Sequence, residues 1–400
     1  MGLIALHHLR VFAVVARLGR VRRAADSLMR APSAVSRSID LLERQLGSPV
    51  FERQSRGMIL TRAGELALAR YARLEQHLSV VLSEAGIRGA EAPPGVVEQL
   101  FDERRLMAAS LLADLQRMAD VGLRLQIRQP AVSAAIHGLE HALGQPLFRR
   151  HGHGLQASGP GVRWLRRFDL ALSELRDLEA DVAALRGSLE GRIVIGALPL
   201  MRTRVLPQAI ARLLAAHPRL QVRAHEDPYE ALCARLRRGH IDFILGALRP
   251  QIEADLSSEP LFVERLGVIA AARHALAGRR TLELSDLRGQ AWVLSRPDTP
   301  LRASLAQFFA QRGESPPRPS VETGDLALVR GLLYEAGMLT VLSTHQLQHE
   351  IDAGAVCVLP VDLQGLHRTI GVTVRKDACL TPGAQALLDA IKALSPSVDE

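Results

Sequence analysis

The polar side chains best placed for chemistry near the N-terminus are those of Ser33, Ser36 and Arg37. Among them, apolar residues recur at the spacing of one helix face, namely Val35, Ile39, Leu42 and Leu46. If that face is buried, the two hydroxyls and the guanidinium lie on the opposite face, free to bind base edges or phosphates. Gly47 follows at the position of a helix-ending glycine. The pattern predicts a helix that reads DNA.

A second copy of this pattern follows 97 residues later, which is the difference between Ser36 and Ser133 and between every other matched pair. The first copy contains Ala34-Val35-Ser36, Leu42-Glu43, Leu46-Gly47, Pro49, Phe51, Arg53, Gly57, Thr61 and Gly64. The second contains Ala131-Val132-Ser133, Leu139-Glu140, Leu143-Gly144, Pro146, Phe148, Arg150, Gly154, Ser158 and Gly161. An ungapped match over about thirty positions indicates a duplicated unit.

Each reader helix is preceded by an amphipathic helical segment and followed by two short strand-like segments around a polar tip. A helix-turn-helix followed by such a hairpin forms a winged helix-turn-helix. In the first copy Arg53 and Arg56 belong to the hairpin, and in the second Arg149 and Arg150 keep its positive charge. Arginines on a wing reach the DNA backbone or the minor groove, where cations bind favourably.

The second copy allows two interpretations. It carries Gln129-Pro130 at the start of its reader helix, followed by Ser133, as a DNA reader could. However, Val121-Gly122 replace the Ala24-Ala25 pair of the first copy, and a glycine inside a helix costs roughly 0.5–1 kcal/mol relative to alanine. This copy is therefore either a second DNA reader or a degenerate unit kept for packing or dimer contacts.

The positive charge is concentrated on the two repeat units. Residues 1–75 contain 13 Arg against 6 Asp and Glu, a balance of +7, and residues 100–168 contain 10 against 5, a balance of +5. Because the whole chain carries only +8, the remaining residues sum to −4. A basic field confined to the repeat units indicates nucleic acid as their partner.

These N-terminal residues resemble the DNA-binding domain of the LysR-type transcriptional regulators. The resemblance rests on Leu9-Arg10-Val11-Phe12, Gly19, Ala24-Ala25, Leu28, Ser33-Ala34-Val35-Ser36-Arg37, Ile39, Leu42-Glu43, Leu46-Gly47, Phe51, Arg53, Thr61 and Gly64. One departure is Ala31-Pro32, where the family usually has Ser or Thr followed by Gln, so an N-cap and a base-reading amide are lost. The expected DNA-binding residues are Ser33, Ser36, Arg37, Arg53, Arg56, Gln129, Pro130, Ser133 and Arg149.

Two long helical segments connect the domains. The first runs from about residue 63 to 85 and ends in a stretch rich in Gly and Pro. The second starts after Ser158 and carries an apolar seam at alternating spacings of three and four, consisting of Phe168, Leu172, Leu175, Leu178, Val182 and Leu185. The seam either packs on its own domain or pairs two subunits. We favour pairing, because a DNA reader gains register from two-fold symmetry and the resembling family uses its linker helix in this way.

From Gly191 onward, strands alternate with helices, which predicts βαβ units and a parallel sheet. Strands are expected at 192–196, 220–225 and 241–246, and a second set at 291–294, 318–322 and 338–342. We expect the chain to return to the first lobe near 356–359 and 370–374, which gives two lobes joined by crossing strands. The region resembles the effector-binding domain of the same family, which is similar to periplasmic solute-binding proteins.

Open α/β sheets bind ligands beyond the carboxyl ends of their strands, where helix N-termini offer free amides. That rule selects the turn after the first strand and a turn in the second lobe. The expected effector-binding residues are Leu198, Arg202, Thr203, Gly246, Ser295 and Thr299. Amides, hydroxyls and an arginine suit a carboxylate or another small anion. The alternative is that these are ordinary strand-to-helix turns with capping hydroxyls.

Other classes of protein find little support. Gly-x-Ser-x-Gly, Walker and His-Glu-x-x-His patterns are all lacking, so no enzyme activity and no catalytic residue is expected. Cys233, Cys357 and Cys379 have no metal spacing, and His151 and His153 lack further ligands nearby, so we expect no metal and no cofactor. No run of eighteen apolar residues and no signal segment occurs, so we expect a soluble cytoplasmic protein without membrane contact.

The predicted fold is therefore multidomain, with two winged helix-turn-helix units and an α/β two-lobed effector domain resembling periplasmic binding proteins. The expected boundaries are 1–62 and 98–160 for the winged units, 63–97 and 161–188 for the linkers, and 189–395 for the effector domain. The predicted function is transcriptional regulation on promoter or operator DNA by a homodimer or tetramer under a small-molecule effector. The alternative is a small-molecule-binding protein whose helix-turn-helix copies serve mainly for oligomerisation.

Overall fold

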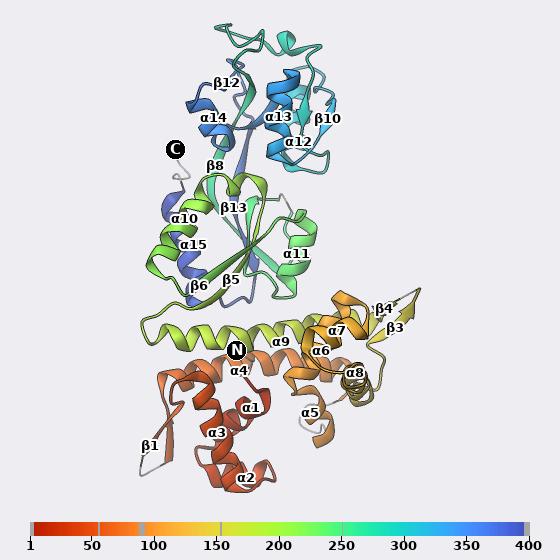
Figure 1. Ribbon diagram of the computed structural model, residues 1–400, viewed down its shortest axis with the longest axis vertical. Helices are drawn as coiled ribbons and strands as arrows, with labels where there is room; N and C mark the ends of the chain where they lie inside the picture. Colours follow the sequence, from red (N-terminus) through yellow and green to blue (C-terminus); the bar gives the residue numbers. More distant parts are fainter. Residues whose placement is uncertain (1–3, 55–56, 88–92, 153, 250, 396–400) are drawn as a thin grey trace. The chain divides into compact units, whose positions relative to one another are not determined.

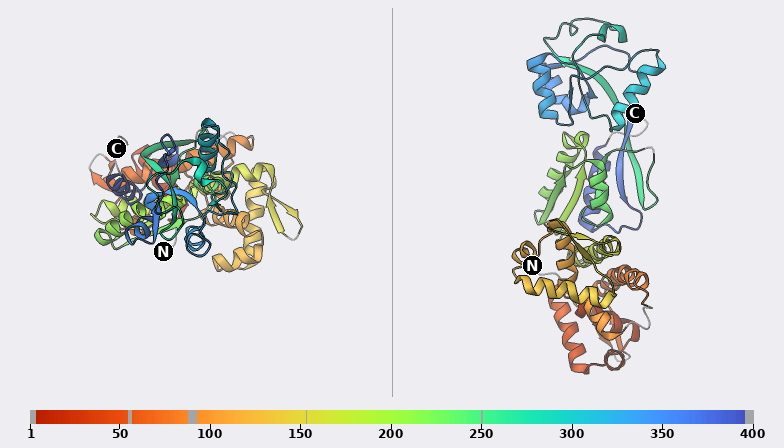
Figure 2. Two further views of the ribbon diagram at one scale, coloured as in Figure 1. Left: turned by 90° about the horizontal axis from the view of Figure 1, so that it is seen from above. Right: turned by 90° about the vertical axis from the view of Figure 1, so that its right-hand side faces the viewer.

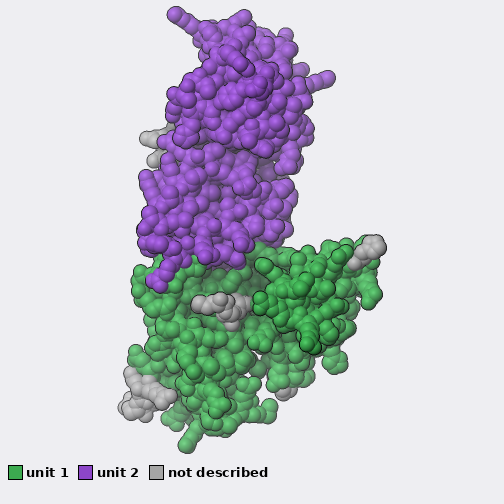
Figure 3. Space-filling model, in the orientation of Figure 1, with its two compact units in different colours: residues 1–191, 237–240, 381–383 green, residues 192–236, 241–380, 384–400 purple. Residues whose placement is uncertain are grey.

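The computed structural model describes residues 4–54, 57–87, 93–152, 154–249 and 251–395. The chain divides into two compact units, coloured separately in Figure 3. The N-terminal unit comprises residues 1–191, 237–240 and 381–383, and the C-terminal unit comprises residues 192–236, 241–380 and 384–400.

The first copy of the repeat is a winged helix-turn-helix. Its helices are α1 (Leu6–Leu18), α2 (Val21–Ser27) and α3 (Pro32–Leu46), and its wing is the hairpin of β1 (Phe51–Gln54) and β2 (Gly57–Leu60). Helix α3 buries the predicted apolar face, begins with Pro32 without a side-chain cap, and ends at Gly47 with φ of 64°. The predicted helix, its buried face and its glycine stop are confirmed.

The second copy forms the same elements in the same order. They are α6 (Glu103–Leu115), α7 (Met118–Leu125), α8 (Gln129–Leu143), β3 (Phe148–His151) and β4 (Gly154–Ala157), preceded by the short helix α5 (Pro94–Leu100). Gly144 ends α8 with φ of 68°, as Gly47 ends α3. Gly122 lies within α7, where a Cβ atom would stand 2.8 Å from the carbonyl oxygen of Ile127. Gly122 is unfavourable for the helix itself, but its lack of a side chain allows the backbone at Ile127 to approach α7 closely.

Two long helices follow the two wings. They are α4 (Arg62–Glu84) and α9 (Gly159–Ala184), capped by the hydroxyls of Thr61 and Ser158. The helices pack against one another within the N-terminal unit (Figure 1). Leu185 of the predicted seam is exposed. The other seam residues are buried within the chain, namely Phe168, Leu172, Leu175, Leu178 and Val182. The pairing between subunits that we favoured for this seam is therefore wrong, because these side chains are already buried within the chain, where α9 packs against α4 and α6.

The first lobe of the C-terminal unit contains β5 (Gly191–Ala197), α10 (Val205–Ala216), β6 (Leu220–His225), α11 (Tyr229–Arg237), β7 (Phe243–Ala247) and α15 (Pro382–Leu394). Strands β5 and β7 pair in parallel, as predicted. Helices α10 and α15 lie on one side of the sheet and α11 on the other (Figure 1). The turn between β5 and α10 contains the 3-10 helix η2 (Pro199–Arg202).

The sheet is mixed rather than parallel because of two long strands, β8 (Leu256–Ala271) and β13 (His367–Arg375). Strand β13 pairs antiparallel with both β7 and β8. The second half of β8 pairs with β11 (Thr340–Ser343) and β12 (Val356–Val358). Figure 2 shows β8 and the segment leading to β13 running between the two lobes. No strand was predicted from the sequence at the position of β8.

The position of β12 differs from the expected one. It pairs with residues 269–271 of β8, so the predicted return to the first lobe near 356–359 is wrong and the return occurs only with β13. The second lobe also contains η3 (Leu284–Leu287), β9 (Val293–Leu294), α12 (Pro300–Gln311), β10 (Val321–Glu322), α13 (Leu326–Ala336), η4 (Thr344–Leu347) and α14 (Gln348–Asp352). Its core is built around Trp292, Phe308 and Phe309.

Candidate nucleic-acid interface and effector site

The reader helices expose equivalent faces. On α3, Ser33 and Arg37 are exposed and Ser36 is half-buried beside the fully buried Val35. Within the described residues, Arg37 makes no hydrogen bond or ion pair, so its guanidinium is available to a ligand. A free, exposed arginine at the start of a reader helix suits a base edge or a phosphate.

Helix α8 repeats this arrangement with different chemistry. Gln129 and Pro130 are exposed, and Ser133 is half-buried beside the buried Val132, as Ser36 is beside Val35. Ala134 occupies the place of Arg37. The second reader thus offers an amide and a hydroxyl where the first offers hydroxyls and a cation.

The wings are fixed by the same contacts in both copies. Thr61 donates its hydroxyl to the Pro49 carbonyl at 2.6 Å and accepts from the Gly64 amide at 3.0 Å. Ser158 donates to the Pro146 carbonyl at 2.5 Å and accepts from the Gly161 amide at 3.0 Å. These hydroxyls join the base of each wing to the helix that follows.

A carboxylate joins each reader helix to its wing. Glu43 Oε1 accepts from the amides of Val50 at 2.9 Å and Phe51 at 3.4 Å. Glu140 Oε1 accepts from the equivalent amides of the second copy, Leu147 at 2.8 Å and Phe148 at 3.3 Å. In the sequence these glutamates appeared only as matching positions of the repeat. In the structure each one connects its reader helix to the first strand of the wing.

Both copies carry exposed arginines that make no ion pair or hydrogen bond within the described part of the chain. In the first copy they are Arg20, Arg22, Arg23, Arg30 and Arg37, and in the second they are Arg117, Arg124, Arg128, Arg149 and Arg150. Of the predicted wing residues, Arg53 lies in β1, and Arg56, like His153 of the second wing, lies outside the described residues. Unpaired surface cations favour a polyanion as partner.

A buried ion cluster joins the two long helices. Arg70 of α4 donates Nε to Asp181 Oδ2 at 2.6 Å and Nη1 to Glu174 Oε2 at 2.8 Å, both on α9. Arg70 is 3 % exposed and the two carboxylate residues are 7 % and 3 % exposed. Burial opposes its charged form, but the neighbouring carboxylates outweigh that cost and raise the pKa of Arg70 above its usual value. The guanidinium therefore stays charged.

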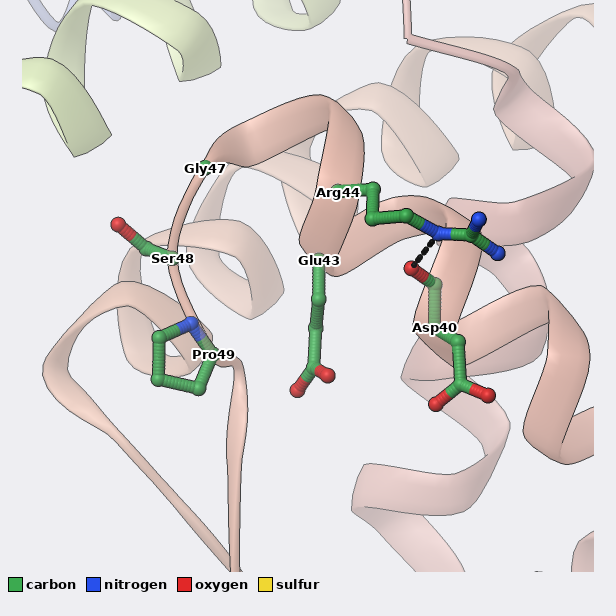
Figure 4. A pocket seen from close by; sticks show the side chains of 6 residues that line it. All are labelled: Asp40, Glu43, Arg44, Gly47, Ser48 and Pro49. Atoms are coloured by element: carbon green, nitrogen blue, oxygen red, sulfur yellow. Dashed lines mark hydrogen bonds between the residues drawn. The ribbon is translucent and has the colours of Figure 1, made fainter.

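The end of α3 faces a shallow hollow rather than a reading surface. Its lining consists of Asp40, Glu43, Arg44, Gly47, Ser48 and Pro49, shown in Figure 4. Arg44 Nε donates to the Asp40 carbonyl at 3.2 Å there. Arg186, which follows α9, donates Nη1 to the Leu46 carbonyl at 3.0 Å and so satisfies a terminal carbonyl of the helix. Two carboxylates beside a helix C-terminus disfavour a DNA phosphate at this end.

In the first lobe of the C-terminal unit, the predicted effector residues follow β5. The amide of Leu198 donates to the Leu245 carbonyl at 2.9 Å, so the free amide expected there is wrong. Leu198 instead packs over Gly246, where a Cβ atom would lie 2.5 Å from the leucine side chain. Arg202 Nη1 pairs with Glu226 Oε2 at 2.8 Å, and Thr203 donates to the Leu200 carbonyl at 3.1 Å.

In the second lobe, the predicted residues gather at the start of α12. Ser295 Oγ lies 2.9 Å from Thr299 Oγ1, and Thr299 caps the helix by accepting from the Arg302 amide at 3.4 Å. Arg302 donates Nη1 to the Ser295 carbonyl at 3.2 Å. The Thr299 hydroxyl therefore acts as the cap of α12, with the Ser295 hydroxyl beside it.

Together these features define a class of protein. Two winged helix-turn-helix units, with exposed arginines that have no ion pair among the described residues, are typical of a DNA-binding region, and two α/β lobes joined by crossing strands form a domain of the kind that holds a small ligand. The combination is that of a DNA-binding regulator that responds to a small molecule.

The chain belongs to the LysR family. The family description "LysR substrate binding domain" matches residues 186–395, and "Bacterial regulatory helix-turn-helix protein, lysR family" matches residues 6–65 and, separately, 104–161. The resemblance drawn from sequence and the duplication are both confirmed. The protein is a LysR-type DNA-binding transcriptional regulator with an effector-binding domain, a class whose members form oligomers.

Relatives agree with this assignment. The chain is 42% identical over 388 residues to the HTH-type transcriptional regulator GalR of Pseudomonas putida, covering 97% of this chain and 96% of the relative. It is 26% identical to GbpR of Azospirillum brasilense, covering 73% of this chain and 86% of the relative. The match to GalR is long enough to include both copies of the repeat.

Solved structures share the fold. A full-length OxyR variant from Pseudomonas aeruginosa is 21% identical with a TM-score of 0.57, covering 73% of this chain and 96% of that one. CbnR, a LysR family transcriptional regulator, is 18% identical with a TM-score of 0.53, covering 74% of this chain and 100% of that one. About a quarter of this chain therefore has no counterpart there, which is what one added repeat would produce. Among the described residues, no helix is long and apolar enough to cross a membrane.

Proposed function

We propose that both copies bind DNA. The first would use Ser33, Ser36 and Arg37 of α3, and the second would use Gln129, Pro130 and Ser133 of α8. The observation that supports this most is the repeated exposure pattern, in which the serine beside the buried valine and its exposed neighbours face outward in both helices. A unit kept only for packing needs neither a polar reader face nor five exposed arginines that have no ion pair or hydrogen bond among the described residues.

The wing arginines would add contacts to the DNA backbone. Arg53 and Arg56 serve this role in the first copy, and Arg149 serves it in the second, where it is exposed on β3. Each phosphate that an arginine neutralises releases counterions, so log K falls with log salt concentration by about 0.9 per phosphate. The binding should therefore weaken steeply with salt.

The test is salt-dependent binding of the full chain to its own upstream DNA. We expect Ser36→Ala with Arg37→Ala, and separately Gln129→Ala with Ser133→Ala, to weaken binding at every salt concentration. Arg37→Ala should also reduce the salt slope by about 0.9 if it contacts a phosphate. Arg62→Ala is the matched control, because Arg62 is exposed but already paired with Glu65 at 2.7 Å. Unchanged binding by the α8 double variant would refute the second reader.

We further propose that the two-lobed domain binds a small carboxylate or similar anion. The site would use Arg202 and Thr203 beside Leu198 and Gly246 in one lobe, and Ser295 and Thr299 in the other. Arg202 is paired with the exposed Glu226 and would exchange that carboxylate for the ligand's. Binding that closes the lobes shifts the regulator toward one of its conformations and changes the bend or spacing imposed on DNA.

Calorimetry with a panel of aliphatic and aromatic carboxylates tests this site. We expect heat of binding from at least one of them, and its loss in Arg202→Ala and Thr299→Ala. Arg279→Ala serves as the control, because Arg279 is exposed and paired with Asp286 at 2.9 Å elsewhere in the second lobe. Equal binding by all three variants would remove these residues from the site.

The chain would act by binding alone, as a cytoplasmic regulator and without catalysis. Its relatives are named as transcriptional regulators, and a regulator that meets chromosomal DNA directly works in the compartment that contains it.

A further inference from the structure

The two long helices of the N-terminal unit run antiparallel. Arg70, early in α4, binds Asp181, late in α9. Glu84, the last residue of α4, accepts from Trp164 Nε1 at 3.1 Å and from Arg163 Nε at 3.1 Å, both early in α9. The helices occupy equivalent places in the two copies, since each follows its wing and begins 97 residues from the other. Equivalent helices that pair antiparallel are related by a two-fold rotation.

A second contact marks the same rotation. The amide of Leu6 donates to Glu103 Oε2 at 3.0 Å, and these residues are equivalent positions at the starts of α1 and α6. A residue meets its own equivalent only close to a two-fold axis. Phe101 packs across the same junction, with Arg10 5.6 Å and Tyr71 6.5 Å from its ring centroid.

The two copies also share one apolar core. A continuous cluster of buried side chains contains Leu42 of α3, Leu139 of α8 and Leu78 and Leu175 of the long helices. Figure 1 shows α1–α3 at one end of the α4–α9 pair and α6–α8 at the other. The pairing of two readers is thus completed inside one chain.

We propose that a single chain is a complete two-reader DNA-binding body, in which α3 and α8 occupy the two half-sites of one operator and these half-sites differ in sequence. The inference rests on the proposed function, in which both copies bind DNA. The half-sites differ because the proposed reading residues do: Ser33 corresponds to Pro130, and Arg37 corresponds to Ala134. An oligomer would repeat this asymmetric unit rather than build a palindrome.

The experiment begins with selection of duplexes from a random-sequence pool by the full-length protein. Each half of the selected consensus is then scrambled in turn. Binding is measured for the wild type, for the α3 variant (Ser36→Ala with Arg37→Ala) and for the α8 variant (Gln129→Ala with Ser133→Ala). Sedimentation of the complexes gives the number of chains per pair of half-sites.

We expect two unlike half-sites and one chain for each pair. Scrambling one half should weaken wild-type binding at least about tenfold, while the variant lacking the reader for that half loses less than about threefold. The other variant should still lose about tenfold on the same DNA. The roles should reverse when the other half is scrambled.

Different outcomes would contradict the single-chain body and the proposed DNA binding by both copies. A palindromic consensus in which each variant loses preference in both halves would overturn the single-chain body, yet leave both copies as readers. If no sequence is enriched, or if the α8 variant binds as the wild type does, the proposed function itself fails.

Discussion

The buried ion cluster between α4 and α9 gives the sharpest prediction about stability. Replacing Arg70 with Met keeps much of the side-chain volume but removes both guanidinium contacts with Asp181, at 2.6 and 3.2 Å. Asp181 is 7 % exposed and would be left without its cation. Glu174 would keep Arg73, which donates to it at 3.0 and 3.1 Å.

The expected cost follows from that imbalance. Removing one partner of a buried pair costs about 3–5 kcal/mol, because the remaining charge is uncompensated. Since Glu174 retains a partner, we expect the low end, about 3 kcal/mol. With a urea dependence of about 1–3 kcal/mol per molar, the unfolding midpoint of the N-terminal unit should fall by about 1–3 M.

Tryptophan fluorescence provides the assay. The chain has two tryptophans, Trp164 in α9 and Trp292 in the C-terminal unit. In a Trp292→Phe background, Trp164 alone reports the helix pair, because it is 1 % exposed and bonded to Glu84 of α4. Urea unfolding of Arg70→Met is then compared with that of Arg62→Met.

A control variant and a double variant test whether the buried cluster stabilises the helix pair. Arg62 and Glu65 are exposed, so Arg62→Met should cost less than about 0.5 kcal/mol. Arg70→Met with Asp181→Leu should recover much of the loss, because apolar replacement of a buried pair is often close to neutral. If Arg70→Met cost no more than Arg62→Met, the cluster would not hold the helices together.

Two further predictions concern the same unit. Gly161→Ala should destabilise it by about 1–3 kcal/mol in urea unfolding, because the new Cβ would stand 2.1 Å from the Leu147 carbonyl oxygen; Gly159→Ala, with open space around it, is the control, and equal effects would refute the packing argument. Burial, with His7 and Arg30 nearby, lowers the pKa of His8 to about 4. Because the unfolded chain binds the proton below pH 6.5 and the folded chain does not, stability should fall between pH 6.5 and 4, by about 1 kcal/mol after discounting for solvent exposure. That dependence should vanish in His8→Gln and persist in His141→Gln; its persistence in both would exclude His8.

The sequence by itself determined the winged units, because their signals are local. The apolar positions of α3 and α8, the stops at Gly47 and Gly144, and the residues flanking each wing all act within a few turns of chain. Such patterns fix which face of a helix is buried and which polar residues remain outside. The same pattern at an offset of 97 residues predicted the second unit without information about packing.

Only the tertiary structure decided what covers each apolar face. The seam of α9 shows from sequence that a partner must exist, but α4 and a second chain satisfy the same periodicity equally well. Likewise, β8 mixes buried and exposed residues along two lobes, so no single alternation marks it, and the placement of β12 depends on which half of β8 it meets. Periodicity records that a surface is buried, whereas the identity of its partner is a property of contacts between residues far apart in the chain.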